Sequence, residues 1–311
     1  MFAKISWAVF VSAFFFSIVP PTVAISYSSE IPSEYGEVIH WSNEKSPDQL
    51  FVIGLSHRDT LTRLNGDKTS RVQAEVYQIG DWLIEHHGVE LLLPEGFFAS
   101  KPAKLEPDKA KTGLEKGKYI RSPGMKAIEE RLADNRSYVN AEMLLNEYHQ
   151  LRLKQVEDEK VYMAVRERVL KLVNTGSSSC DYPAVKSDLD YQQDKRTAIL
   201  LQRIPGIVDE EFQNGNIKSR KAIFTIGMAH IQKIIEFLNE RQIKISAPSP
   251  TSNRREDDPS ELNLLKENFG VCIIIPRTLA DDQKCLEMNG LNKIVSPFRK
   301  QFSPVFSKAS P

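Results

Sequence analysis

The sequence is poor in cysteine and has no excess of charge of either sign. Its 311 residues include 3 cysteines, and no CxxC pair or finger-like spacing of cysteine and histidine is present, which argues against a structural zinc site. Lysine plus arginine and aspartate plus glutamate number 41 each, so net charge gives no reason to expect nucleic acid or an anionic membrane as a partner. The Gly-x-Ser-x-Gly and His-Glu-x-x-His motifs are also missing, which argues against an α/β-hydrolase-type serine hydrolase and a zincin.

The few cysteines are expected to have different roles. Cys272 lies in the apolar run FGVCIIIP, which places it in the core. Cys180 and Cys285 lie in polar stretches, where they could pair with each other in an oxidising compartment.

The longest apolar run lies at the N-terminus. Lys4, the apolar residues 7–19 and the small residues at 22–24 predict a secretory signal peptide at residues 1–24. The mature chain would then begin near Ile25, in a periplasm or outside the cell, and no stable membrane span is expected after cleavage. An uncleaved N-terminal anchor is the alternative.

Four apolar runs are typical of buried strands: FVIGL, VELLLP, KAIFTIG and FGVCIIIP. Residues 69–88 separate the first two, with apolar residues at helical spacing and Gly88 as the expected end of the helix. A strand, a helix and a strand of these lengths form a βαβ unit with parallel strands. We therefore predict an α/β fold with a mixed, mainly parallel central sheet flanked by helices.

The stretch between the second and third strands is long, charged and mostly helical. It predicts a helical insertion at about residues 101–205 that caps the C-terminal edge of the strands, and Pro205-Gly206 is expected to turn the chain. Residues 25–300 are thus expected to form a single domain. A weakly patterned tail follows at residues 301–311.

Two of the strands end in the same Gly-x-x-His turn. Gly54 precedes His57, and Gly227 precedes His230. A glycine in such a turn is expected to adopt a positive φ and to let the backbone approach closely. Glu95 stands just past the apolar part of a further strand. Because ligands bind beyond the carboxyl ends of parallel strands, these side chains are predicted to line one crevice.

These residue types allow two kinds of chemistry. His57, Glu95 and His230 form a suitable ligand set for a divalent metal such as Mn, Co or Zn. They are equally suited to metal-free general acid and base catalysis. Arg58 and Asp59 follow His57 and are secondary candidates for binding, since charges beside a turn are usually solvated.

The segments VIGLSH, LLLPEG and TIGMAH, in this order, resemble the landmarks of the TraB/Tiki/erythromycin-esterase superfamily, which includes the ChaN-type haem-binding lipoproteins. The resemblance spans roughly Glu37 to Arg277. It implies that Arg196, in DKRTAILLQRI, is the family's helical arginine, which would orient a carboxylate or stabilise an oxyanion. Members of the family are variously proposed to be metal-dependent peptidases, macrolide esterases or haem-binding proteins.

The leading hypothesis is an exported hydrolase that acts on a peptide or small molecule, with or without a divalent metal. His57 and His230 would be metal ligands or acid/base groups, and Glu95 a third ligand or a base that activates water. The alternative is a non-catalytic haem or small-ligand binding protein, in which the histidines face an apolar cavity. A member that binds a partner and keeps the motifs for structure is a third interpretation.

Overall fold

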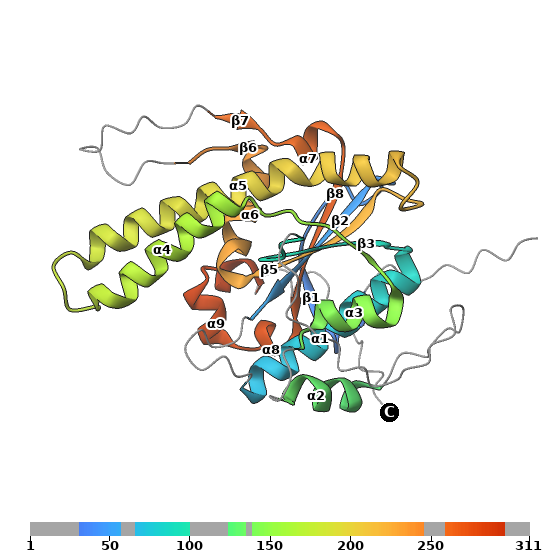
Figure 1. Cartoon of the computed structure of the whole chain (residues 1–311), viewed down its shortest axis with the longest axis horizontal. Helices are drawn as coiled ribbons and strands as arrows, with labels where there is room; N and C mark the ends of the chain where they lie inside the picture. Colours follow the sequence, from blue (N-terminus) through green and yellow to red (C-terminus); the bar gives the residue numbers. More distant parts are fainter. Residues whose placement is uncertain (1–30, 57–65, 100–123, 135–138, 246–258, 296–311) are drawn as a thin grey trace, which may run out of the picture.

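The computed structural model describes residues 31–56, 66–99, 124–134, 139–245 and 259–295 (Figure 1). The predicted signal peptide, its cleavage site and the predicted tail lie outside the described residues, as do His57, Arg58 and Asp59. No helix in the described ranges is long and apolar enough to cross a membrane.

A six-stranded sheet with the order β1-β8-β2-β5-β3-β4 lies at the centre of the molecule. Its strands are β1 (Gly36–Ser42), β2 (Gln49–Leu55), β3 (Leu91–Pro94), β4 (Arg152–Leu153), β5 (Lys221–Gly227) and β8 (Gly270–Pro276). Neighbouring strands pair in parallel except at the edge, where β1 is antiparallel to β8. The prediction of a mixed, mainly parallel sheet is therefore confirmed. The four apolar runs became strands because both faces of the sheet are covered, which suits continuous hydrophobic sequences.

The helices divide between the two faces of the sheet (Figure 1). Helices α1 (Asp67–His87), α2 (Met125–Ala133) and α3 (Ala141–His149) cover one face, and α5 (Tyr182–Gln213) and α6 (Ile231–Glu240) lie on the other. The chain thus leaves β2 through α1 on one side and leaves β5 through α6 on the other. Such a reversal between neighbouring parallel strands is the point at which α/β sheets bind ligands. Helix α1 ends at Gly88 with φ 65°, as predicted.

The smaller elements fill the periphery. They are α4 (Glu159–Thr175), the 3₁₀ turn η1 (Met228–His230), β6 (Gln242–Ile243), β7 (Ser260–Glu261), α7 (Asn263–Lys266), α8 (Arg277–Ala280) and α9 (Gln283–Met288). Strands β6 and β7 form a separate antiparallel pair. Helix α4 runs along the first half of α5, and together they project from the body of the molecule (Figure 1). We call this projection, residues 159–192, the arm.

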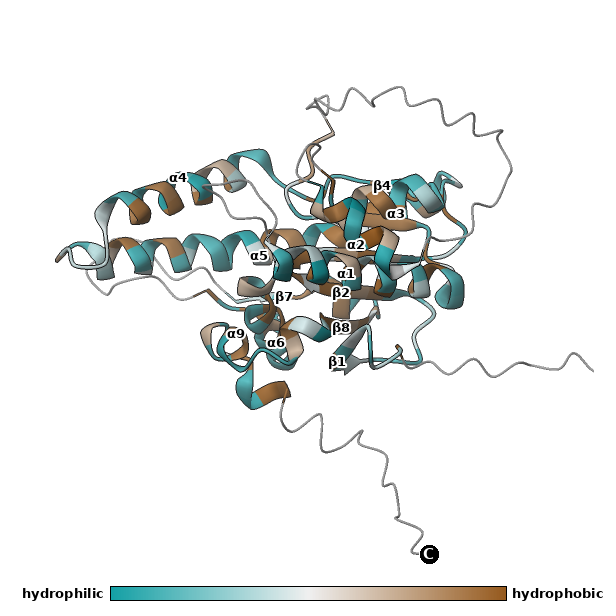
Figure 2. Ribbon diagram, turned by 90° about the horizontal axis from the view of Figure 1, so that it is seen from below, coloured by the Kyte–Doolittle hydropathy of each residue, from teal (hydrophilic) through white to brown (hydrophobic). Residues whose placement is uncertain are grey.

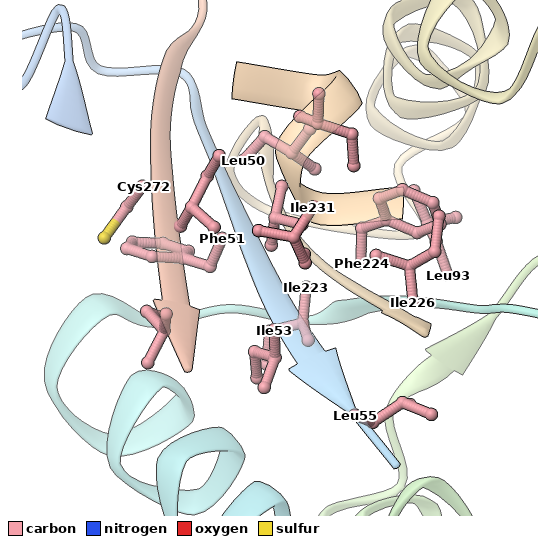
Figure 3. Close-up of a cluster of buried hydrophobic side chains, with 14 of the residues drawn as sticks. Leu50, Phe51, Ile53, Leu55, Leu93, Ile223, Phe224, Ile226, Ile231 and Cys272 are labelled. Carbon is pink, nitrogen blue, oxygen red and sulfur yellow. The ribbon is translucent and has the colours of Figure 1, made fainter. Parts of the chain in front are cut away.

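The core is built from the central strands and the helices against them (Figure 3). Leu50, Ile53, Ile223 and Phe224 are completely buried. Cys272 is also in the core, as predicted, and its burial raises the pKa of its thiol. The disulfide considered from the sequence is not formed. All three cysteines are free: Cys180 is at the far end of the arm, and Cys285 is on α9 in the body.

The predicted turn of the chain at Pro205-Gly206 is wrong. Helix α5 continues through Pro205 and Gly206 to Gln213. A proline inside a helix removes one hydrogen bond and costs about 3 kcal/mol or more. Here Ile204, Pro205 and Val208 are buried on one continuous face of α5, so packing outweighs that cost. This unbroken helix carries Arg196 to the C-terminal ends of β3 and β5.

Candidate functional site

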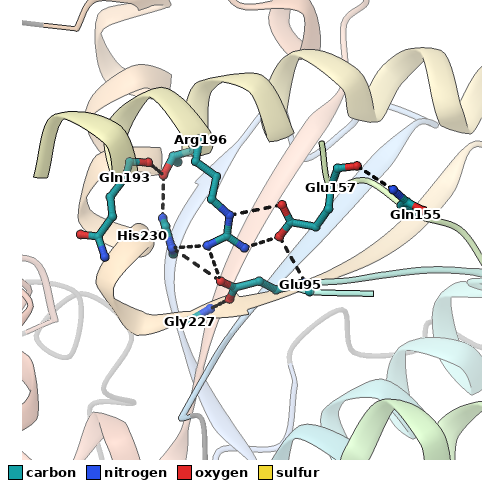
Figure 4. A network of polar contacts seen from close by, with 9 residues as sticks. Glu95, Gln155, Glu157, Gln193, Arg196, Gly227 and His230 are labelled. Atoms are coloured by element: carbon teal, nitrogen blue, oxygen red, sulfur yellow. Dashed lines mark hydrogen bonds and ion pairs between the residues drawn. The ribbon is translucent and has the colours of Figure 1, made fainter. Parts of the chain in front are cut away.

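Three of the predicted site residues meet at the C-terminal edge of the sheet (Figure 4). Glu95 follows β3, Arg196 lies on α5, and His230 lies in η1 directly after β5. Nη1 of Arg196 is 2.8 Å from Oε1 of Glu95 and 3.3 Å from Nε2 of His230. The predicted convergence is therefore observed for Glu95 and His230, and Arg196, which sequence reasoning took from the family resemblance alone, lies with them.

Glu95 is held in place from both sides. Its Oε2 accepts a hydrogen bond from the backbone N–H of Gly227 at 2.6 Å, and its own N–H donates to the carbonyl of Thr225 at 3.0 Å. Its Oε1 lies 3.7 Å from Nε2 of His230. The carboxylate therefore joins the ends of β3 and β5, because it bonds to the last residue of β5.

Glu157 is a member of the site that sequence reasoning missed. Its side chain is 0 % exposed and accepts two hydrogen bonds from Arg196, one of them from Nε at 3.2 Å. Its Oε1 also accepts the backbone N–H of Gly96 at 3.2 Å. Glu157 lies in the charged run VEDEK just before α4, where nothing in the sequence separates it from solvated neighbours.

The charge of Arg196 is fixed by these carboxylates. Burial alone would lower the pKa of the guanidinium, but the hydrogen bonds and the negative charges of Glu157 and Glu95 raise it above its usual value. Four of its five N–H groups are accounted for by Glu157, Glu95 and His230. Arg196 therefore organises the site, and at most one of its donors is left for a ligand.

The protonation of His230 follows from its neighbour on α5. The hydroxyl of Thr197 is 2.8 Å from the backbone oxygen of Gln193 and 2.7 Å from Nδ1 of His230. Two oxygens at this separation share a proton, so Thr197 donates to Gln193 and must accept from Nδ1–H. Nε2 faces a donor, the guanidinium of Arg196, so we assign it as the unprotonated nitrogen. His230 is then a neutral imidazole whose basic nitrogen points at Glu95 and Arg196.

The expected positive φ at the two predicted glycines is wrong. Gly227 has φ −58° and ψ 144°, and Gly54 is not among the residues with positive φ. Gly54 instead allows close approach, because a Cβ there would lie 2.7 Å from Sδ of Met228. The left-handed turn is at Gly96, with φ 71°, immediately after Glu95. The turn that needs a glycine thus follows β3, and sequence reasoning did not single out Gly96 for this role.

The strand that precedes the first Gly-x-x-His turn ends beside β5. The histidine of this turn lies outside the described residues, but β2 is described to its last residue. Leu55, two residues before His57, pairs with Gly227 at the end of β5. His57 therefore follows the strand adjacent to the one that carries His230, and its convergence with the site stays a prediction.

Two aromatic rings lie against the ion cluster. The guanidinium of Arg196 is 5.1 Å from the ring centroid of Tyr162, in the first turn of α4. The ring of Phe98 packs edge-on against Tyr162 at 5.0 Å. Tyr162 is partly exposed, so it forms one outer boundary of the cluster.

Comparisons with known proteins do not add to this geometry. No family model, curated protein or solved structure matches this chain. The functional interpretation therefore depends on the site itself.

A divalent metal does not fit the described residues as they are arranged. No group of three His, Cys, Asp or Glu side chains in the described ranges could hold one. By triangulation, a metal 2.0–2.2 Å from both Oε1 of Glu95 and Nε2 of His230 would be at most about 3.6 Å from Nη1 of Arg196. That places a dication against a buried cation. A haem does not fit either, because Nε2 of His230 faces charged groups where an apolar cavity is needed.

Proposed function

We propose that this protein is an exported hydrolase of the TraB/Tiki/erythromycin-esterase type that cleaves an ester or peptide bond in a small molecule or peptide. His230 is its general base, and the reaction needs no metal. The observation that carries the proposal is the pair of contacts on the His230 ring, Thr197 at Nδ1 and Arg196 at Nε2. They favour a neutral imidazole with its basic nitrogen in the site.

The chemistry proceeds through a water placed between His230 and the substrate carbonyl. This water replaces the N–H of Arg196 as the donor to Nε2, which has a single lone pair. Nε2 takes a proton from the water as its oxygen attacks the carbonyl carbon, and the carbonyl oxygen becomes the oxyanion. Oε1 of Glu95, 3.7 Å from Nε2, stabilises the imidazolium that forms. The imidazolium then returns the proton to the leaving group. Arg196 keeps Glu95 ionised, because its fixed positive charge is 2.8 Å from the carboxylate.

The first experiment screens the purified protein for hydrolysis of p-nitrophenyl esters, fluorogenic peptides and a macrolide lactone. Each assay is run with EDTA and with added Mn, Co or Zn. We expect turnover that EDTA leaves intact, and a loss of about 10²- to 10⁴-fold in kcat/KM in His230→Ala. His86→Ala is the matched control, because His86 is an exposed histidine at the end of α1.

Two results would contradict the proposal in different ways. Activity that disappears with EDTA and returns with one metal would mean that the site rearranges around a metal. A Soret band after addition of haemin, with no turnover of any substrate, would favour the binding protein. Circular dichroism of His230→Ala distinguishes loss of the base from loss of the fold.

A further inference from the structure

Most of the surface of helix α4 is exposed to solvent, including several apolar side chains. Of its 17 residues, Val165 alone is buried in the described structure. Val169, Leu170 and Val173 are 36 %, 54 % and 63 % exposed. Most helices in proteins are stabilised by packing an apolar face, and α4 packs one side only, against α5.

Leu170 lies on the side of α4 that faces away from α5, and Val169 and Val173 lie on the flank between Leu170 and the buried Val165. Val165 is buried toward α5, and Arg168 forms an ion pair with Asp188 of α5 at 3.1 Å. At about 100° per residue, Leu170 is turned roughly 140° from Val165 and 160° from Arg168. Figure 2 shows apolar stretches along α4 where it projects from the body. We call Val169, Leu170 and Val173 the outer apolar strip.

We propose that two copies of the chain pair antiparallel through the outer apolar strip of α4, so that the two arms form a four-helix contact. A second copy fits because the charges beside the strip are self-complementary. Glu167 and Lys171 are exposed, and neither forms an ion pair with another described residue. They lie one turn apart on the same flank of α4.

The antiparallel arrangement follows from the order of these charges. In an antiparallel helix pair, like flanks meet and the sequence runs in opposite directions. A two-fold axis level with Val169, midway between them, sets Glu167 of one copy against Lys171 of the other. The symmetry makes the same contact twice. In a parallel pair opposite flanks meet, so Glu167 and Lys171 of the two copies would not face each other.

The contact is small, so the dimer is weak. A 17-residue helix is about 25 Å long, and one such contact falls below the roughly 1,200 Å² of stable complexes. We therefore expect a dissociation constant in the micromolar range.

The first test measures the oligomeric state by sedimentation velocity over a wide range of protein concentration. The wild-type protein is expected to shift from monomer to dimer as its concentration rises. Leu170→Asp with Val173→Asp is expected to stay monomeric at every concentration. Met288→Asp is the matched control, because Met288 is 77 % exposed on α9, away from the arm, and should dimerise like the wild type. Circular dichroism checks that all variants fold.

The second test exchanges the charges. Glu167→Lys alone and Lys171→Glu alone each place two like-charge contacts in the dimer, and each is expected to weaken it about tenfold. The double exchange restores both contacts, so it is expected to recover wild-type dimerisation. Because Glu167 and Lys171 are also four residues apart on one helix, circular dichroism checks that the single variants keep α4 folded, and recovery in the double variant then indicates contact between two copies.

Three outcomes would overturn the proposal. The wild-type protein stays monomeric at all concentrations, or the dimer survives Leu170→Asp with Val173→Asp, or the double exchange is no better than the single changes. A monomer that sediments with mixed phosphatidylcholine and phosphatidylglycerol vesicles, and loses this in Leu170→Asp, would assign the strip to a membrane surface instead.

Discussion

Two arginines anchor ion clusters at opposite ends of the sheet. Arg196 lies at the C-terminal ends of β3 and β5 with Glu95 and Glu157, and its side chain is 6 % exposed. Arg220 immediately precedes β5 at the other end, and its side chain is 23 % exposed. It pairs with three carboxylates: Asp48 just before β2, Asp209 on α5 and Glu267 before β8.

Both clusters place carboxylates around an arginine, but they differ in whether they contain an imidazole and in which end of the sheet they occupy. The Arg196 cluster contains an imidazole with an assigned basic nitrogen, and it lies where parallel strands present residues to ligands. The Arg220 cluster has no histidine among its described partners, and its guanidinium stacks on the buried ring of Phe269 at 5.0 Å. Arg220 therefore holds strand ends together, whereas Arg196 also contacts Nε2 of the His230 imidazole.

Arg196→Ala should have the largest effect on stability. It leaves Glu157 and Glu95 buried without their cation, and breaking a buried ion pair from one side costs about 3–5 kcal/mol. Urea denaturation followed by circular dichroism measures the change. Because this variant can fail to fold, Glu157→Gln is its companion, and it should lose less because it keeps the shape. A change below about 1 kcal/mol in Arg196→Ala would mean that the cluster is solvated.

Arg220→Ala should destabilise the protein less, by about 1–2 kcal/mol, because its three partners are partly exposed and such pairs contribute little each. The same urea titration applies. It should leave any turnover of substrate unchanged per folded molecule. If Arg220→Ala lost as much activity as His230→Ala, the purely structural role that we assign to the Arg220 cluster would be wrong.

Tyr162→Ala should expose His230 to reagents. Tyr162 is a partly exposed ring over Arg196, whereas Phe269 under Arg220 is fully buried. We expect modification of His230 by diethylpyrocarbonate to accelerate several-fold, measured by peptide mass spectrometry. Tyr162→Phe keeps the ring and should react like the wild type, and His86 serves as the exposed reference. Equal rates in all three proteins would mean that Tyr162 does not cover the site.

The smallest effect is expected from Glu267 and depends on pH. Burial, with a hydrogen bond and the negative charge of Asp209, raises the pKa of Glu267 against the opposing effect of Arg220. When the pKa of a carboxyl is higher in the folded protein than in the unfolded chain, protonation of that carboxyl favours the folded state. This stabilisation is complete at pH values below the unfolded-state pKa and is lost as pH rises through the folded-state pKa. Glu267→Gln should therefore gain stability relative to wild type at neutral pH and show no gain near pH 4. A gain that is the same at both pH values would contradict this linkage.

The sheet was predictable because its signal is local. The strands of this parallel sheet are continuous apolar runs, and Gly88 ends α1 as its sequence predicts. The two-residue strand β4 is too short to leave a pattern. The passage of α5 through Pro205 was missed because a tertiary effect, the burial of its apolar face, outweighs a local one.

The site was predictable only where a strand end marks it. Glu95 and His230 follow apolar runs, and that position is visible in the sequence. Glu157, Thr197 and Tyr162 act through contacts with residues far along the chain, and each stands in a charged stretch like many others. The dihedral prediction failed at Gly54 because this residue lies within β2, and the side chain that crowds it, Met228, comes from a distant turn.

At the base of the arm, Glu157, just before α4, and Arg196, within α5, bond to each other in the site. Because α4 and α5 run antiparallel outward from this pair, helical turns added to or removed from both helices together leave Glu157 and Arg196 in place. The loop around Gly176, between the two helices, is therefore the place where length can vary at the least cost to the site. A small folded domain inserted there would be carried outward on the arm, while an insertion between Asp194 and Arg196 would turn Arg196 and Thr197 away from His230 together.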